Sequence, residues 1–170
     1  MNLKNLRILL EGREKSRNFG IGKNRFINHF NPLNTMAYKI IDIEGVGEAY
    51  APKLIKAGIA KVEELLEKCA TPKGRAELAE ATGISEKLIL KWTNHADLFR
   101  IKGVGPQFSE LLEAAGVDTV KEFRHRVAEN LQQKLQETND AKHLVRRVPS
   151  VKELVKMIEQ AKELKPVMTY

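Results

Sequence analysis

The sequence contains only one cysteine, Cys69, and four histidines among its 170 residues. One cysteine cannot close an internal disulfide or build a metal site from several thiolates, and it is typical of a reducing compartment. The histidines are scattered, without the i, i+4 spacing of a helical zinc motif and without a His-Glu-x-x-His sequence. We therefore expect a cytoplasmic protein with no metal and no cofactor.

Long hydrophobic runs and strand-like segments are also missing. No apolar stretch approaches the ~18–20 residues that a membrane span needs, and Ile8-Leu9-Leu10 is too short for the core of a signal peptide. Tyr38-Lys39-Ile40-Ile41 is the one candidate strand, and it is short. The sequence therefore predicts an all-α protein that does not bind a membrane.

Motifs for catalysis are absent as well. Cys69 has no nucleophile motif around it, and the carboxylates are spread along the chain as in any charged helical protein. Gly20-Ile21-Gly22-Lys23 fails the phosphate-loop pattern, because Asn24 stands where Ser or Thr is required. We expect no enzymatic activity and see no evident small-molecule substrate.

The formal net charge of +7 is concentrated at the N-terminus. Residues 1–35 hold seven Lys and Arg against two Glu, whereas residues 36–170 hold 22 Lys and Arg against 20 Asp and Glu. The nearly equal numbers of positive and negative charges in residues 36–170 are typical of an ordinary soluble domain. We interpret residues 1–35, which are rich in Asn and lack periodicity, as a flexible basic extension. Met36 follows directly, so a second interpretation places the true start there, and a third takes the extension as a mitochondrial presequence.

A repeat dominates the rest of the chain. Ile43–Ile59 and Ile101–Val117 lie 58 residues apart and are identical at seven of 17 positions, including the turns Gly45-Val46-Gly47 and Gly103-Val104-Gly105. A fixed-offset repeat indicates a duplicated architecture. We expect one unit over residues 36–100 and another over residues 101–170. A unit of that size buries little surface by itself, so the two should pack into one pseudo-symmetric body.

Helix start and stop signals recur around both turns. Apolar residues at helical spacing follow each turn, and Gly58 and Gly116 stand where left-handed glycines end helices. Trp92, at helical spacing from Leu88 and Ile89, is expected in the core. The sequence predicts about ten short helices. Their expected N-terminal caps are Thr71-Pro72, Ser85, Thr119 with Glu122, and Ser150 with Glu153.

The apolar-x-Gly-apolar-Gly pattern before an amphipathic helix resembles the helix-hairpin-helix module. More closely, residues 36–166 resemble a bacterial family of tandem helix-hairpin-helix proteins of unknown function. This resemblance implies sequence-independent binding of a nucleic-acid backbone, DNA in the first place, with turn amides and nearby cations on phosphate oxygens. The residues that carry the resemblance are Ile43, Gly45, Val46, Gly47, Leu54 and Gly58, then Ile101, Gly103, Val104, Gly105, Leu111, Leu112 and Gly116.

The two turns differ as phosphate sites. Glu44 and Glu48 flank the first turn and would repel a phosphate, whereas Lys102 precedes the second turn and Gln107 follows it. The second turn is therefore the better candidate. The alternative is a protein–protein interaction scaffold or accessory module that binds no nucleic acid, in which the basic clusters are solvated faces. The candidate phosphate-binding residues are Lys102, Gly103, Val104, Gly105, Gln107, Gly45, Val46, Gly47, Lys73, Arg75, Arg146 and Arg147.

Overall fold

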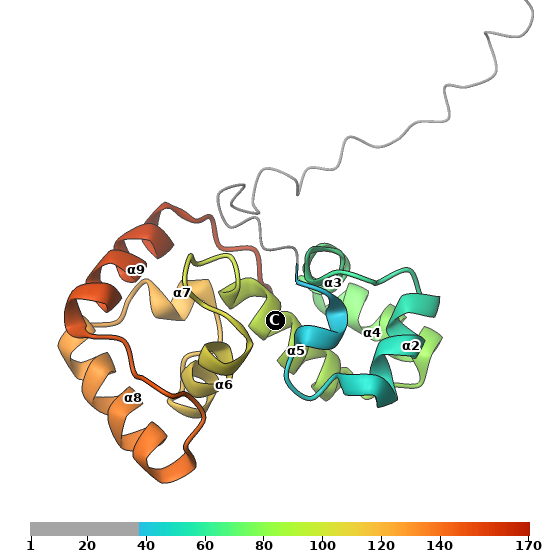
Figure 1. Cartoon of the computed structure of the whole chain (residues 1–170). Helices are drawn as coiled ribbons and strands as arrows, with labels where there is room; N and C mark the ends of the chain where they lie inside the picture. The colour runs from blue at the N-terminus through green and yellow to red at the C-terminus, as the bar shows by residue number, and fades with distance from the viewer. Residues whose placement is uncertain (1–37) are drawn as a thin grey trace, which may run out of the picture.

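The computed structural model describes residues 38–170, whose regular structure is helical (Figure 1). They form one short 3-10 helix and eight α-helices, with no strand in this part of the chain. The predicted all-α class is confirmed, and the predicted total of about ten helices is slightly too high. Residues 1–35, with Gly20-Ile21-Gly22, lie outside the described residues. The helices are η1 Ile40–Asp42, α2 Gly47–Lys56, α3 Val62–Cys69, α4 Pro72–Thr82, α5 Glu86–Leu98, α6 Pro106–Ala114, α7 Val120–Phe123, α8 Ala128–Lys142 and α9 Val151–Glu163.

The one candidate strand, at Tyr38–Ile41, is not formed. Lys39 makes only an isolated antiparallel bridge with Lys61, and the chain then enters η1. The Ile40 N–H donates to the Ala60 carbonyl at 2.9 Å, which fastens this entry segment to the start of α3. The segment thereby serves as the lead-in to the first glycine turn.

Helix α5 runs between two groups of helices (Figure 1). α2, α3 and α4 lie at one end of the molecule, and α6, α7, α8 and α9 at the other. α5 packs against α3, α4 and α6, and every residue from Trp92 to Arg100 is buried. A helical segment that is buried on every side is typical of the core of a protein, so the second half of α5 is part of the core. The expectation that Trp92 belongs to the core is confirmed.

The two repeated helices end with the same hydrogen bonds. After α2, the Gly58 N–H donates to Ile55 and the Ile59 N–H donates to Leu54, both at 2.9 Å. After α6, the corresponding bonds run from Gly116 and Val117 to Glu113 and Leu112, again at 2.9 Å. Gly58 and Gly116 have φ values of 85° and 82°. These are Schellman caps, and they confirm the predicted helix ends.

The predicted N-terminal caps are present, with one change. The hydroxyls of Thr71, Ser85 and Ser150 each accept a backbone N–H of the helix that follows. At α7, the Thr119 hydroxyl accepts from the Glu122 N–H, but the Glu122 carboxylate reaches the Asp118 N–H at 2.7 Å instead of closing a box on Thr119. The sequence therefore predicted where these helices begin.

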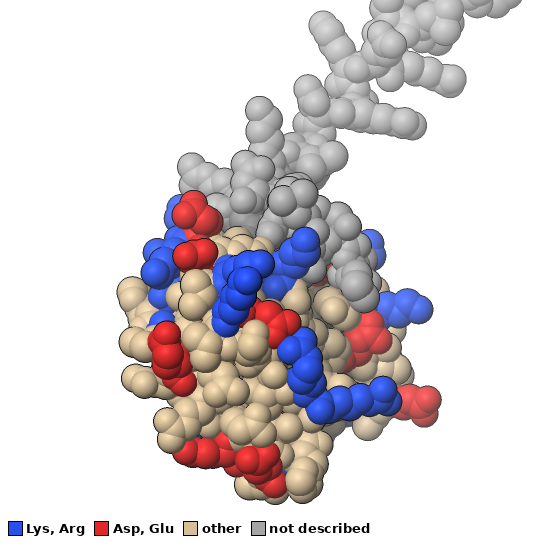
Figure 2. Space-filling model, turned by 60° about the vertical axis from the view of Figure 1, so that its left-hand side comes forward, with Lys and Arg blue, Asp and Glu red and all other residues tan. Residues whose placement is uncertain are grey.

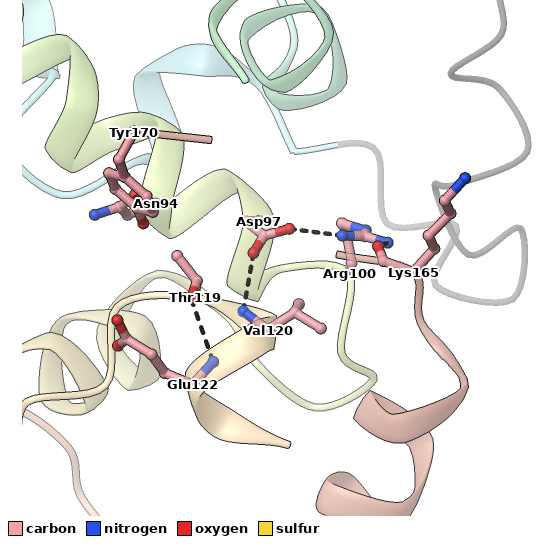
Figure 3. A network of polar contacts seen from close by, with 8 residues as sticks. All are labelled: Asn94, Asp97, Arg100, Thr119, Val120, Glu122, Lys165 and Tyr170. Carbon is pink, nitrogen blue, oxygen red and sulfur yellow. Dashed lines mark hydrogen bonds and ion pairs between the residues drawn. The ribbon is translucent and has the colours of Figure 1, made fainter. Parts of the chain in front are cut away.

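The C-terminal segment, residues 164–170, crosses back from α9 to the other end of the molecule; we call it the C-terminal strap. The Thr169 N–H donates to the Ala70 carbonyl at 2.9 Å, at the end of α3. The Arg100 guanidinium, after α5, donates to the Lys165 carbonyl at 2.8 Å (Figure 3). The strap therefore forms a second connection between the two groups of helices, beside α5.

Candidate functional site: a groove between two glycine turns

The two Gly-Val-Gly turns are alike at their first glycine and differ at the second, where Gly47 has a φ of 49° and Gly105 a φ of −118°. Gly45 and Gly103 have φ values of 86° and 92°, in the left-handed region that favours glycine. The middle valines are buried, and their N–H groups donate to Ile43 and Ile101 at 3.1 and 3.0 Å. No side chain caps the helix that follows either turn. Both turns therefore present an uncapped helix N-terminus, which attracts negatively charged or carbonyl oxygens.

The second turn is held tightly by its neighbours. A Cβ atom added at Gly103 would lie 2.9 Å from Met157 Cε of α9, and one added at Gly105 would lie 3.2 Å from the Tyr38 hydroxyl. The Lys102 backbone N–H donates to the Gln160 side-chain oxygen at 2.9 Å. The turn is thus packed between α9 and the segment that leads into the first turn.

An open groove of about 880 Å³ separates this lead-in segment from the N-terminus of α6. Apolar side chains from both sides line it, and Ile41 is 42% exposed there. Asp42 and Glu44 contribute carboxylates, while none of the lining residues is Lys or Arg. The apolar residues along the groove are Tyr38, Ile41, Pro106, Phe108 and Val145.

The groove brings together parts of both predicted turn sites. Gly105 and Gln107 line it from the second turn, and Glu44 lines it from the first. Gly45, Val46 and Gly47 border a smaller hollow of about 350 Å³, which Glu44 also lines. The residues that sequence reasoning missed are Tyr38, Ile41, Asp42, Phe108 and Val145. No local pattern could have singled them out, because they meet only through tertiary packing.

Arg75 corrects one sequence prediction. It is 3% exposed, and its guanidinium donates to the carbonyls of Cys69 at 3.1 Å, Ala70 at 3.3 Å and Thr169 at 2.9 Å. Arg75 therefore holds the C-terminal strap against the end of α3 and presents no cation to a phosphate. From the sequence, a cation in the first turn of α4 suggested an anion site. The true acceptor, the Thr169 carbonyl, is 94 residues away in sequence and could not be identified from it.

The other predicted cations are dispersed. Lys73 is exposed and lies 3.8 Å from the Glu77 carboxylate. Arg147 donates through both terminal nitrogens to Glu153 at 2.8 Å, and this contact lowers the pKa of the Glu153 carboxyl. Arg146 and Lys102 are exposed. On the face that carries α8 and α9, Figure 2 shows basic and acidic side chains interspersed, without one continuous basic surface.

A second polar cluster lies beside α6. Glu113 accepts from His95 Nε2 and pairs with Lys91 Nζ, both at 3.0 Å, and hydrogen bonding to His95 holds the pKa of this carboxyl below its ordinary value. His95 is buried, and its Nδ1 has no hydrogen-bond partner. The cluster fastens α5 to α6. Among residues 38–170, no group of three His, Cys, Asp or Glu side chains is placed to hold a metal ion.

The described residues thus form an all-helical protein in which the second glycine turn and the segment that leads into the first border one groove. Residues 44–164 match the family model described as a domain of unknown function, DUF4332. This match covers most of the chain, which therefore belongs to that family. No curated protein matches the chain, and no solved structure matches it. Within the described residues, no helix is long and apolar enough to cross a membrane.

Proposed function

We propose that this protein is a non-enzymatic docking module, and that the groove between the two glycine turns receives a segment of another protein. The observation that carries the proposal is the lining of the groove. Apolar side chains form its walls and two carboxylates stand within it, with no Lys or Arg among its lining residues. Exposed apolar surface rimmed by polar groups is typical of a protein interaction site.

The charges near the turns support a protein ligand over a nucleic acid. Backbone binding to nucleic acid depends on Lys and Arg that neutralise phosphates. Of the predicted cations, Arg75 is buried, while Lys73 and Arg147 have carboxylate partners. A phosphate placed at the N-terminus of α6 would lie in the groove that also contains Glu44.

Site-specific photocrosslinking in cells tests this function. A photoreactive benzoylphenylalanine at Gln107, an exposed groove residue, should crosslink to a protein, and the product should survive nuclease treatment. The control places the same group at Glu80, which is exposed on α4 and does not line the groove. A nuclease-resistant product at position 107 but not at position 80 supports docking. Only nuclease-sensitive products, or none, would contradict it.

Nucleic-acid binding is the second candidate, with the two turns acting as helix-hairpin-helix elements. The uncapped N-terminus of α6, which follows Lys102 after the three residues of the turn, favours it. A labelled duplex should then shift at ~50 mM salt with micromolar protein, since non-specific binders reach Kd values of roughly 10⁻⁴–10⁻⁶ M even at physiological salt. Gly105→Glu should weaken the shift. No shift under these conditions would rule this candidate out.

We also propose that the protein works in a reducing compartment, the cytoplasm. The only thiol, Cys69, is buried and free, and burial raises its pKa to about 11. A buried thiol with a raised pKa is unreactive, and the fold does not depend on oxidising it to a disulfide. Fractionation of cells that produce the tagged protein tests the location, and recovery in an extracytoplasmic fraction would contradict it.

A further inference from the structure

We infer that the groove takes a protein segment in which a Lys or Arg side chain is flanked by apolar side chains. This inference rests on the docking function proposed above and names the chemistry of the partner. Three features of the groove carry it: the carboxylates on one side, the helix N-terminus on the other, and the apolar walls between them.

The carboxylate side is formed by residues around η1. The Asp42 carboxylate accepts the Lys39 N–H at 2.8 Å, which fixes its position. Glu44 is exposed and has no hydrogen-bond or ion-pair partner among the described residues. A carboxylate with free acceptor capacity beside apolar surface favours a cationic donor, and Lys or Arg supplies one on a long apolar stem.

The opposite side of the groove, the N-terminus of α6, requires hydrogen-bond acceptors instead of donors. α6 begins at Pro106, which has no N–H, and no side chain caps its first turn. The amides of Gln107 and Phe108 therefore need oxygen acceptors at the groove. The carbonyl groups of an extended protein segment are such acceptors, and they bring no negative charge toward Glu44.

A polyanion such as a nucleic acid would interact favourably with only one side of the groove, the N-terminus of α6. Phosphate oxygens would accept from the N-terminus of α6, but they would be repelled by the carboxylates across the groove. A protein segment provides carbonyl oxygens for α6 and a cation for Glu44. Its apolar side chains cover the exposed Ile41 and the adjoining apolar walls. The complementarity of all three features selects this class of ligand.

Fluorescence anisotropy with the full-length protein tests the inference. The probes are two labelled peptides with the same leucines, one interspersed with lysines and the other with glutamates. The lysine peptide should bind at least about tenfold more tightly, because its ammonium groups can pair with Glu44, whereas the groove carboxylates repel the glutamate peptide. Glu44→Gln should weaken lysine-peptide binding about fivefold to tenfold. A labelled DNA duplex is titrated in parallel.

Glu48→Gln is the matched control, because Glu48 is also an exposed carboxylate near the first turn but does not line the groove. It should change the affinity less than about twofold, because Glu48 stands outside the groove, where solvent and salt screen its charge from the peptide. Equal binding of the two peptides, equal effects of the two substitutions, or tighter binding of the duplex than of the lysine peptide would each overturn the inference. If crosslinking at position 107 still captures a protein, the docking function stands and only the partner's chemistry is wrong. If it captures none, the docking function itself is wrong.

Discussion

Arg100 Nη1 lies 2.6 Å from Asp97 Oδ1, and both side chains are buried between the two groups of helices (Figure 3). The second Asp97 oxygen accepts the Val120 N–H of α7 at 2.8 Å. The Arg100 guanidinium also donates to the Lys165 carbonyl of the strap at 2.8 Å. One ion pair at the end of α5 therefore fixes both α7 and the C-terminal strap.

Asp97→Asn should destabilise the protein by about 3–5 kcal/mol, because it leaves the Arg100 charge buried without its carboxylate. Urea denaturation followed by circular dichroism measures the loss. The double variant Asp97→Leu with Arg100→Met removes both charges. It should therefore lose less stability than the sum of the losses in Asp97→Leu alone and Arg100→Met alone. Additive losses in this cycle would show that the two side chains are not coupled.

Arg75 and Lys73 should behave differently although both lie in the first turn of α4. Arg75→Ala removes the guanidinium that donates to three carbonyl groups and holds the strap, so we expect a loss of at least about 2 kcal/mol. Lys73→Ala removes one exposed ion pair and should cost less than about 0.5 kcal/mol. Urea titrations of the two variants are directly comparable, and similar losses would contradict the structural role of Arg75.

Gly74→Ala should be strongly destabilising, against the usual preference for alanine in helices. An added Cβ would lie 1.8 Å from the Lys68 carbonyl oxygen, so the backbone would have to move. We expect a loss of more than about 2 kcal/mol, as in other overpacked sites. The control is Ala81→Gly on the exposed side of α4, with an expected cost of about 1 kcal/mol. A thermal melt of Gly74→Ala at or above the wild-type midpoint would contradict the packing described here.

Glu113 should make stability depend on pH in the acid range. Hydrogen bonding to His95 lowers its folded-state pKa below the ordinary value of 4.5. Its contribution is therefore fully present above that value and is lost as the pH falls through the lower, folded-state pKa. Glu113→Gln should cost roughly 1–2 kcal/mol at pH 7 and progressively less as the pH is lowered below about 4.5. Urea titrations across this range, with Glu80→Gln as the exposed control, measure the difference, and a constant difference would contradict the assignment.

The elements could be predicted from sequence where the determining signal is local. The caps at Thr71, Ser85 and Ser150 and the glycines that end α2 and α6 each act within a few residues, and each is present in the structure. The duplication at 58 residues likewise indicated two similar turns, and the structure adds that the first glycine of each is left-handed.

The site could not be predicted in the same way, because it depends on contacts between distant segments. Glu44 was recognised only as a neighbour of the first turn, whereas packing places it in one groove with Gly105. Arg75 was read as a surface cation because its partner, Thr169, lies at the other end of the chain. Charge patterns near a turn thus gave candidates, and tertiary packing decided which of them line the groove.

Amide chemical-shift mapping of the ¹⁵N-labelled full-length protein tests the docking groove most directly. Titration with the lysine peptide should shift the amides of residues 41–44 and of Gly105, Gln107 and Phe108, on both sides of the groove, while Glu80 and its neighbours on α4 stay in place. A DNA duplex at the same concentrations should leave the groove amides unchanged. Shifts of residues 105–108 caused by the duplex and not by the peptide would contradict the account and favour phosphate binding at the second turn.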